Sequence, residues 1–82
     1  MSRRYRLQYA PPADQARHTM PPALRNAFDT GMQRLATDPY GLDSTAIDKD
    51  DDRRQAVVAG TVIRYYVSQD VLVVTVVRVV YV

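Results

Sequence analysis

Arginine and tyrosine side chains recur at spaced positions toward the C-terminus, and they are the residues of this sequence best suited to chemistry. Arg64 and Tyr66 are two residues apart, so a strand would place both on one face, and Arg53 and Gln55 would share a face in the same way. Arg78 interrupts a stretch that is otherwise apolar. Guanidinium groups bind phosphate through two parallel hydrogen bonds, and tyrosine rings stack on unpaired bases. The pattern indicates a phosphate-binding surface, unless Arg78 instead pairs with an aspartate or reaches solvent at a sheet edge.

Such a surface could also cleave RNA. Arginines such as Arg64 and Arg78 can stabilise the charge that develops on phosphate during transfer, and a tyrosine can act as general acid or base. Cleavage and binding remain two separate hypotheses at this point.

Several other kinds of site are excluded by residue content. The chain has one histidine, no cysteine and no glutamate, which leaves no supported catalytic triad and no zinc cluster. The run Asp48–Asp52 imitates the first half of a calcium loop, but Arg53 and Ala59 stand where the loop needs glycine and a bidentate glutamate. His18 lies among polar residues and is expected at the surface. We therefore expect neither a metal site nor a cofactor.

Charge is distributed unevenly along the chain. The net charge is +2, yet residues 43–52 hold five aspartates and one lysine, a local charge of −4, so the remainder carries +6. This basic remainder includes Arg4, Arg6 and Arg54, which we predict to bind RNA or phosphate together with Arg53 and Tyr66. A basic face suits a polyanion or an acidic protein partner, although solvated surface charge that keeps a small domain soluble explains it equally well.

Two kinds of hydrophobic pattern predict the elements that position these side chains. Residues 4–9 alternate as a half-buried strand does, and prolines at positions 12 and 21–22 favour the starts of two antiparallel helices. In the second helix Leu24, Phe28, Met32 and Leu35 recur on one helical face, and the helix is expected to end before Pro39.

The C-terminal part reads as three strands. Residues 53–59, 61–68 and 71–82 are rich in β-branched and aromatic residues and are separated by short turns, whereas residues 40–52 read as loop. The last strand is apolar on both faces, so we expect it inside the sheet. The sequence thus predicts an α+β fold of order β-α-α-β-β-β, with about four antiparallel strands and a helical hairpin packed on one face.

Length and leader signals set the remaining bounds. At 82 residues the chain is expected to form one domain, residues 1–82, near the lower size limit of a self-sufficient core. No apolar stretch is long enough for a spanning helix, and the first residues lack the features of a signal peptide, so we expect no membrane insertion and a cytoplasmic location.

Taken together, the order of elements and several short motifs resemble the RelE/ParE superfamily of bacterial toxin–antitoxin toxins. The motifs are a basic aromatic first strand, Leu35-Ala-Thr-Asp-Pro39 after the helical hairpin, Tyr65-Tyr-Val67 in a later strand, and Arg78-Val79 in the final strand. The resemblance spans essentially the whole chain. In length and in its ending, the chain is most similar to the YoeB branch.

The resemblance implies a protein toxin with a cognate antitoxin as its partner. RelE-type and YoeB-type members cleave mRNA on the ribosome, whereas ParE-type members poison DNA gyrase. Tyr81 matches the terminal catalytic tyrosine and Arg53 a basic family position, but Val62 and Val80 stand where the family has a catalytic arginine and a histidine. Arg64 could stand in for the missing arginine.

The resulting hypothesis is a ribosome-dependent mRNA endonuclease with a reduced catalytic site, in which Tyr81, Arg64 and Arg78 are catalytic. The alternative is a related protein without nuclease activity, either a gyrase-type poison or a protein that only binds an antitoxin. Formation of a homodimer is left open.

Overall fold

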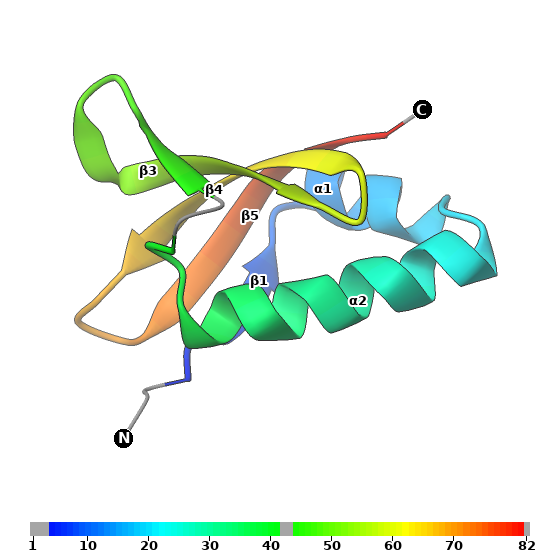
Figure 1. The fold of residues 1–82 in the computed structure, drawn as a ribbon, viewed down its shortest axis with the longest axis horizontal. Helices are drawn as coiled ribbons and strands as arrows, with labels where there is room; N and C mark the ends of the chain where they lie inside the picture. Colours follow the sequence, from blue (N-terminus) through cyan, green and yellow to red (C-terminus); the bar gives the residue numbers. More distant parts are fainter. Residues whose placement is uncertain (1–3, 42–43, 82) are drawn as a thin grey trace.

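The computed structural model describes residues 4–41 and 44–81, which form two helices and five strands (Figure 1). The helices are α1 (Pro11–His18) and α2 (Pro22–Thr37), and both begin with proline in the first turn, as predicted. The strands, in chain order, are β1 (Arg6–Tyr9), β2 (Ser44–Ile47), β3 (Asp50–Val58), β4 (Thr61–Ser68) and β5 (Val73–Val80).

The strands form one mixed sheet in the order β1-β5-β4-β3-β2. The expected inner position of the last strand is confirmed, because β5 lies between β1 and β4. The direction of one strand differs from the prediction. β1 pairs with β5 in parallel, while the other neighbouring strands pair antiparallel as expected. Tight turns enforce antiparallel pairing from β2 to β5, but β1 is connected through two helices, so no turn fixes its direction.

The fifth strand, β2, lies within the stretch expected to be loop. It pairs with β3 across a two-residue turn at Asp48 and Lys49, whose φ angles are 54° and 66°. Two positive φ angles are typical of the type I′ hairpin turn. This edge strand has the burial pattern intermediate, exposed, exposed, intermediate, so its sequence shows no alternation that could reveal it.

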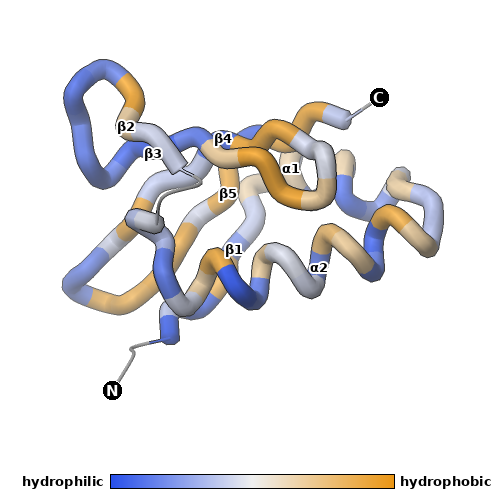
Figure 2. Tube along the Cα trace, viewed as in Figure 1, coloured by the Kyte–Doolittle hydropathy of each residue, from blue (hydrophilic) through white to orange (hydrophobic). Residues whose placement is uncertain are grey.

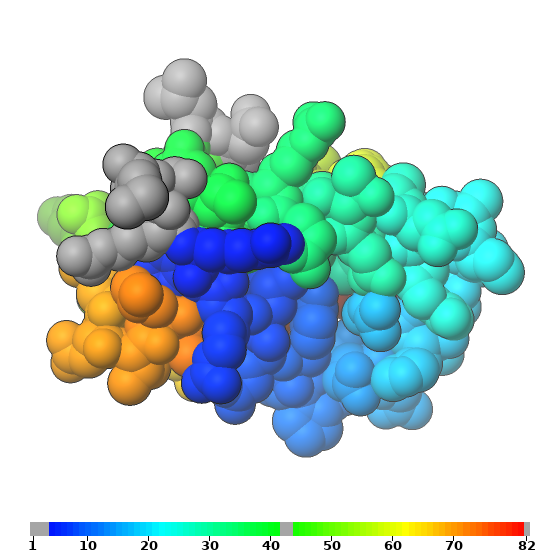
Figure 3. Space-filling model, turned by 90° about the horizontal axis from the view of Figure 1, so that it is seen from below, coloured from blue at the N-terminus to red at the C-terminus, as the bar shows by residue number. Residues whose placement is uncertain are grey.

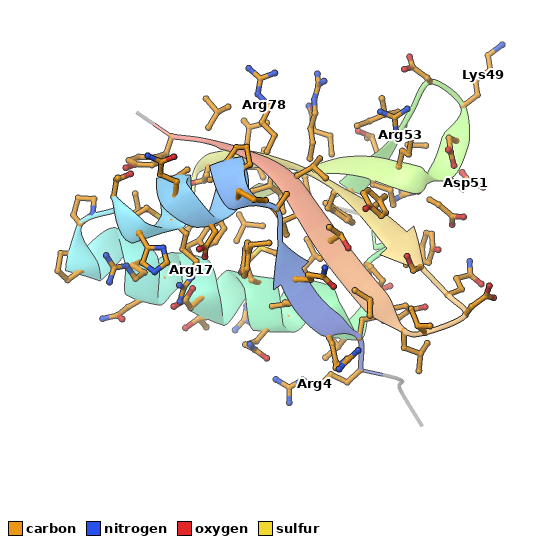
Figure 4. The ribbon with its side chains drawn as sticks, turned by 180° about the vertical axis from the view of Figure 1, so that it is seen from behind. Arg4, Arg17, Lys49, Asp51, Arg53 and Arg78 are labelled. Carbon is orange, nitrogen blue, oxygen red and sulfur yellow. The ribbon has the colours of Figure 1, made fainter. Side chains whose placement is uncertain are left out.

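Both helices cover the same face of the sheet, as predicted (Figures 1 and 4). Phe28 and Met32 of α2 are fully buried, and they belong to one core cluster with Ile63, Tyr65 and Val74 of the sheet. At Gly31 the helix approaches β3 so closely that an added Cβ would lie 2.5 Å from Cγ1 of Val58. Seen from below, α2 and β1 lie side by side (Figure 3), and the amide of Tyr5 donates to the carbonyl of Ala36 at 2.9 Å.

The two helices are joined by side-chain contacts. Arg17 donates from Nε and Nη2 to the two carboxylate oxygens of Asp29, both at 2.8 Å, which is a bidentate ion pair. Arg25 donates from Nη2 to the carbonyl of His18 at 2.7 Å, next to the end of α1. The helical hairpin is therefore braced independently of the sheet. No helix among the described residues is long and apolar enough to span a membrane.

Candidate functional site

Within residues 4–41 and 44–81, no helix covers one face of the sheet, and we call this face the open face. It is identified by alternation in β4, where Ile63, Tyr65 and Val67 are buried under the helices while Val62, Arg64 and Tyr66 are exposed. Strand pairing then assigns the neighbouring side chains. The open face is made of Arg6, Gln8, Arg53, Gln55, Val57, Val62, Arg64, Tyr66, Ser68, Val73, Thr75, Val77, Arg78 and Val80.

A β-bulge in β5 decides which way Arg78 points. Tyr65 pairs with Val76 and Arg64 pairs with Arg78, so Val77 is an extra residue in the ladder. Val76 and Val79 are buried, while Val77 and Arg78 are both exposed. Without the bulge, strict alternation from Val76 would send the Arg78 side chain into the core. The bulge turns it to the open face instead, where Figure 4 shows Arg78 directed away from the helices.

The side chains of the open face form rows across the strands. The central row runs from Gln55 to Arg64 to Arg78, and Nε of Arg64 donates to Oε1 of Gln55 at 3.2 Å. Next to it lies an apolar row of Val57, Val62 and Val80. The two rows enclose a hollow of about 260 Å³, lined by Gln55, Val62, Arg64, Arg78 and Val80.

The third row contains Arg53 of β3, paired with Tyr66 of β4. The Tyr66 side chain is 42% exposed. A larger hollow of about 640 Å³ lies between this row and the hairpin of β2 and β3, with lining that includes Asp48, Asp50, Arg53, Arg64 and Tyr66. Sequence reasoning missed this hollow, because it depends on β2, which was expected to be loop.

Of the predicted catalytic residues, the structure brings Arg64 and Arg78 together but not Tyr81. The Tyr81 ring packs against the core on the helical side, and its hydroxyl lies 2.5 Å from Oγ1 of Thr19, just after α1. Thr19 already donates its single hydroxyl proton to the carbonyl of Ala16 at 2.8 Å, so Tyr81 is the donor to Thr19. The Tyr81 hydroxyl is therefore engaged away from the open face.

The residues predicted to bind phosphate lie on different sides of the molecule. Arg53 and Arg6 lie on the open face, whereas Arg4 hydrogen-bonds Gln33 of α2 and lies far from Arg78 and Arg53 (Figure 4). Arg54 is only 9% exposed and points to the helical side. The structure does not place Arg4 and Arg54 with the other predicted ligands.

Each of the three guanidinium nitrogens of Arg54 donates a hydrogen bond to an acceptor nearby in the chain. Nε donates to Oγ of Ser44 at 2.9 Å, Nη2 to the carbonyl of Ser44 at 3.3 Å, and Nη1 to the carbonyl of Asp51 at 3.1 Å. Its guanidinium carbon also lies 5.4 Å from the centroid of the Tyr40 ring. These contacts join β2 to β3 and exclude Arg54 from binding phosphate on the open face.

Tyr40 belongs to the same structural cluster. Its hydroxyl donates to Oδ1 of Asp52 at 2.7 Å and accepts from Nε2 of Gln69 at 2.8 Å. Burial, followed by the hydrogen bond to Asp52, raises the pKa of Tyr40 to about 12. Burial likewise raises the pKa of Tyr65, whose hydroxyl donates to the carbonyl of Pro39 at 2.6 Å. Both tyrosines therefore stay protonated to a higher pH than a free tyrosine does, and their hydrogen bonds hold Pro39 and Tyr40, just after α2, against the sheet.

Of the acidic segment, residues 48–52 form the hairpin tip and the start of β3, residues 44–47 form β2, and Asp43 lies outside the described residues. Figure 2 shows this tip as strongly hydrophilic. Among the described residues no group of three or more acidic, histidine or cysteine side chains is arranged to hold a metal ion.

No protein-family model matches the chain, and no curated protein matches it in sequence. Solved structures do match. A toxin–antitoxin complex, RelBE2 from Mycobacterium tuberculosis, contains a chain that superposes with a TM-score of 0.83 at 15% identity, over 100% of this chain and 98% of that one. The archaeal RelE–RelB complex from Pyrococcus horikoshii OT3 gives a TM-score of 0.77 at 18% identity, over 94% and 93% of the two chains. The fold is therefore RelE-like along the whole chain.

Proposed function

We propose that this chain is the toxin-type component of a type II toxin–antitoxin pair, that it binds a cognate antitoxin protein, and that it acts on ribosome-bound mRNA through the open face. The fold supports the first part, because the similar solved structures are toxin–antitoxin complexes. The open face supports the last part. It is the side of the sheet that neither helix covers, and Arg6, Arg53, Arg64 and Arg78 lie on it.

The observation that carries the RNA-binding role is the arginine pair. Arg64 and Arg78 are paired on the neighbouring strands β4 and β5, and among the described residues neither forms an ion pair. Arg53, in the neighbouring row, also has no acidic partner within that part of the chain. Like charges placed opposite each other are destabilising unless an anion neutralises them. An RNA backbone supplies such anions at regular intervals, and each guanidinium can bind a phosphate through two hydrogen bonds.

In a cleavage reaction these residues would act on the phosphate itself. A ribose 2′-hydroxyl loses its proton and attacks the adjacent phosphorus, the bond from phosphorus to the 5′-oxygen of the next nucleotide breaks, and that departing oxygen takes up a proton. Negative charge grows on the phosphate oxygens during this transfer, and Arg64 and Arg78 stabilise that charge. Proton transfer is the weaker part of this site, because Tyr81 is bonded to Thr19 and Val62 and Val80 carry no titratable group. The proposed nuclease is therefore a reduced one that relies on the ribosome to position the substrate and assist proton transfer.

The second candidate is binding without cleavage, and the pairing of Val62 with Val80 favours it. These valines sit beside the arginine pair, at the positions where the resemblance implied a catalytic arginine and histidine. In that case the chain blocks its target or only binds an antitoxin.

Expression in a bacterial host tests both candidates. Growth arrest with mRNA cut in translated frames, abolished by Arg64→Ala, supports the nuclease, whereas arrest without mRNA cleavage supports the second candidate. Normal growth under verified expression of soluble protein would contradict a toxic role. Co-purification with the protein encoded in the adjacent reading frame tests the antitoxin partner separately.

A further inference from the structure

The hollow beside Tyr66 is lined by basic, apolar and acidic side chains, a mixture that suits an organic ligand better than an inorganic ion. Arg53 and Arg64 supply positive charge, Tyr66 and Val77 supply apolar surface, and Asp48 and Asp50 supply carboxylates from the hairpin. Asp52 also lines the hollow, but its Oδ1 already accepts the hydrogen bond from Tyr40. Its volume of about 640 Å³ lies within the range of roughly 300–1,000 Å³ that is typical of small-molecule sites. The lining indicates a ligand with a phosphate, a flat ring and hydrogen-bond donors.

The accessible groups are free to make such contacts. The Tyr66 side chain is 42% exposed and that of Val77 is 37% exposed, so a ring can lie against them. Asp50 uses Oδ1 to accept from the amide of Asp52 at 3.0 Å, while its Oδ2 and both carboxylate oxygens of Asp48 accept no hydrogen bond from another described residue. These oxygens can only accept hydrogen bonds, so they favour a ligand edge that donates.

We propose that this hollow binds one unpaired RNA base that carries an exocyclic amine, and that it excludes uracil. This inference rests on the proposed RNA-binding role of the open face. The base stacks on Tyr66, its phosphate contacts Arg53 or Arg64, and Asp48 or Asp50 accepts from its Watson–Crick edge.

The chemistry of the four bases sets the order of preference. Guanine presents two adjacent donors, which match the two oxygens of one carboxylate, so it should bind best. Adenine and cytosine each offer one amine. Uracil offers a single N–H between two carbonyl oxygens, which a carboxylate repels. The acidic hairpin, unfavourable for a polyanion in general, thereby becomes a determinant of base preference.

Fluorescence anisotropy at low salt tests this with labelled RNA heptamers UUUXUUU, where X is each of the four bases. The purified full chain should bind the guanine heptamer about tenfold more tightly than heptauridine, the order expected for one good bidentate base contact. In Asp48→Asn/Asp50→Asn that ratio should fall toward one. Asparagine tolerates the positive φ of 54° at position 48, so the variant should fold.

Asp70→Asn is the matched control, because it removes one exposed carboxylate from the β4–β5 connection, outside the hollow. It should leave the base ratio unchanged. If the Asp48→Asn/Asp50→Asn variant binds all heptamers more tightly by one common factor, the hairpin acts only by repulsion and the base site is wrong.

The remaining outcomes separate this inference from the proposed function. Salt-dependent binding that Arg64→Ala weakens, with no difference among the four heptamers, overturns the base site alone. Absence of binding to every heptamer, or binding indifferent to salt and to Arg64→Ala, overturns the RNA-binding role of the open face and the base site with it.

Discussion

Arg64 and Arg78 are cross-strand partners on β4 and β5, and the bulge at Val77 is what brings their side chains to the same face. Directly opposed residues have Cβ atoms about 5 Å apart, so the two positive charges repel each other in the absence of a ligand. Nε of Arg64 is bonded to Gln55, a neutral acceptor that leaves its charge uncompensated. The pair therefore costs stability in the free protein and gains it when an anion binds.

Replacing Arg78 should consequently move stability and binding in opposite directions. Arg78→Thr relieves the repulsion and should raise the free energy of unfolding by roughly 0.2–1 kcal/mol, measured by urea denaturation. The same variant should reduce the log–log salt slope of single-stranded RNA binding by about 0.7, the contribution of one phosphate contact. Arg34→Ala, on the exposed side of α2, should leave that slope unchanged. A less stable Arg78→Thr protein would show that this arginine has a structural partner.

The adjacent residues Arg53 and Arg54 offer a matched comparison. Arg54→Ala removes three donors from partly buried hydrogen bonds and should destabilise the fold by about 1–3 kcal/mol. Arg53→Ala, at an exposed position, should change stability by less than about 0.5 kcal/mol and should weaken RNA binding. Thermal denaturation and salt-dependent binding of both variants check this, and equal stability losses would contradict the assignment.

The order of elements and the buried faces follow from short-range patterns in the sequence. Alternation in β4 and the helical repeat of Phe28 and Met32 report burial directly, so the helical face of the sheet was predictable. The strand β2 was not, because an exposed edge strand need not alternate. The parallel pairing of β1 depends on the path of two helices, which no local pattern reports.

The candidate site was predictable only in part, for reasons of strand geometry. Arg53 and Arg54 are neighbours in one strand, so they had to point to opposite faces, and period two already separates them. Arg78 and Tyr81 are three residues apart, which again implies opposite faces. The orientation of Arg78 relative to the core depends on the bulge, and a strand made mostly of valine contains no signal for that irregularity.

The bond between Tyr81 and Thr19 predicts a way to separate anchoring from catalysis. Tyr81→Phe and Thr19→Val each remove this hydrogen bond, and Thr19→Val also removes the bond from Thr19 to the carbonyl of Ala16. Tyr81→Phe should destabilise the fold by roughly 0.5–1.5 kcal/mol and Thr19→Val by somewhat more, with a double variant less affected than the sum. If Tyr81 has only the anchoring role, toxicity on expression should follow the loss of stability in both variants. Loss of mRNA cleavage in Tyr81→Phe alone would instead assign the tyrosine to the reaction.

The turn between β3 and β4 carries removable strain. Ala59 has a φ of 52° and Gly60 a φ of 75°, so both central residues are in the left-handed region, which costs a residue with a Cβ about 1–2 kcal/mol. Ala59→Gly should therefore raise the free energy of unfolding by roughly 1 kcal/mol, less the greater entropy of glycine in the unfolded chain. Gly60→Ala, the reverse change next to it, should destabilise, although among the described residues no atom beyond the two chain neighbours lies within 4 Å of the added Cβ. Urea denaturation of both variants measures the difference, and a less stable Ala59→Gly protein would contradict the turn geometry.

Stability should fall in alkaline solution through Tyr40. Its pKa is raised from 10.0 to about 12, first by burial and then by its bond to Asp52, so the folded state holds this proton more tightly than the unfolded state does. The free energy of unfolding contributed by this group is fully present below pH 10 and is lost as the pH rises from 10 to about 12. Tyr40→Phe removes the titrating group together with the bonds to Asp52 and Gln69, so it should be less stable than the parent at pH 8 and should lose less stability above pH 10. The two curves of stability against pH, measured by urea denaturation at fixed ionic strength, should converge near pH 12.

Parallel curves would contradict this role of Tyr40. They would show that the loss of stability at high pH comes from Tyr9 and Tyr65, whose pKa values are also raised by burial and which titrate in both proteins.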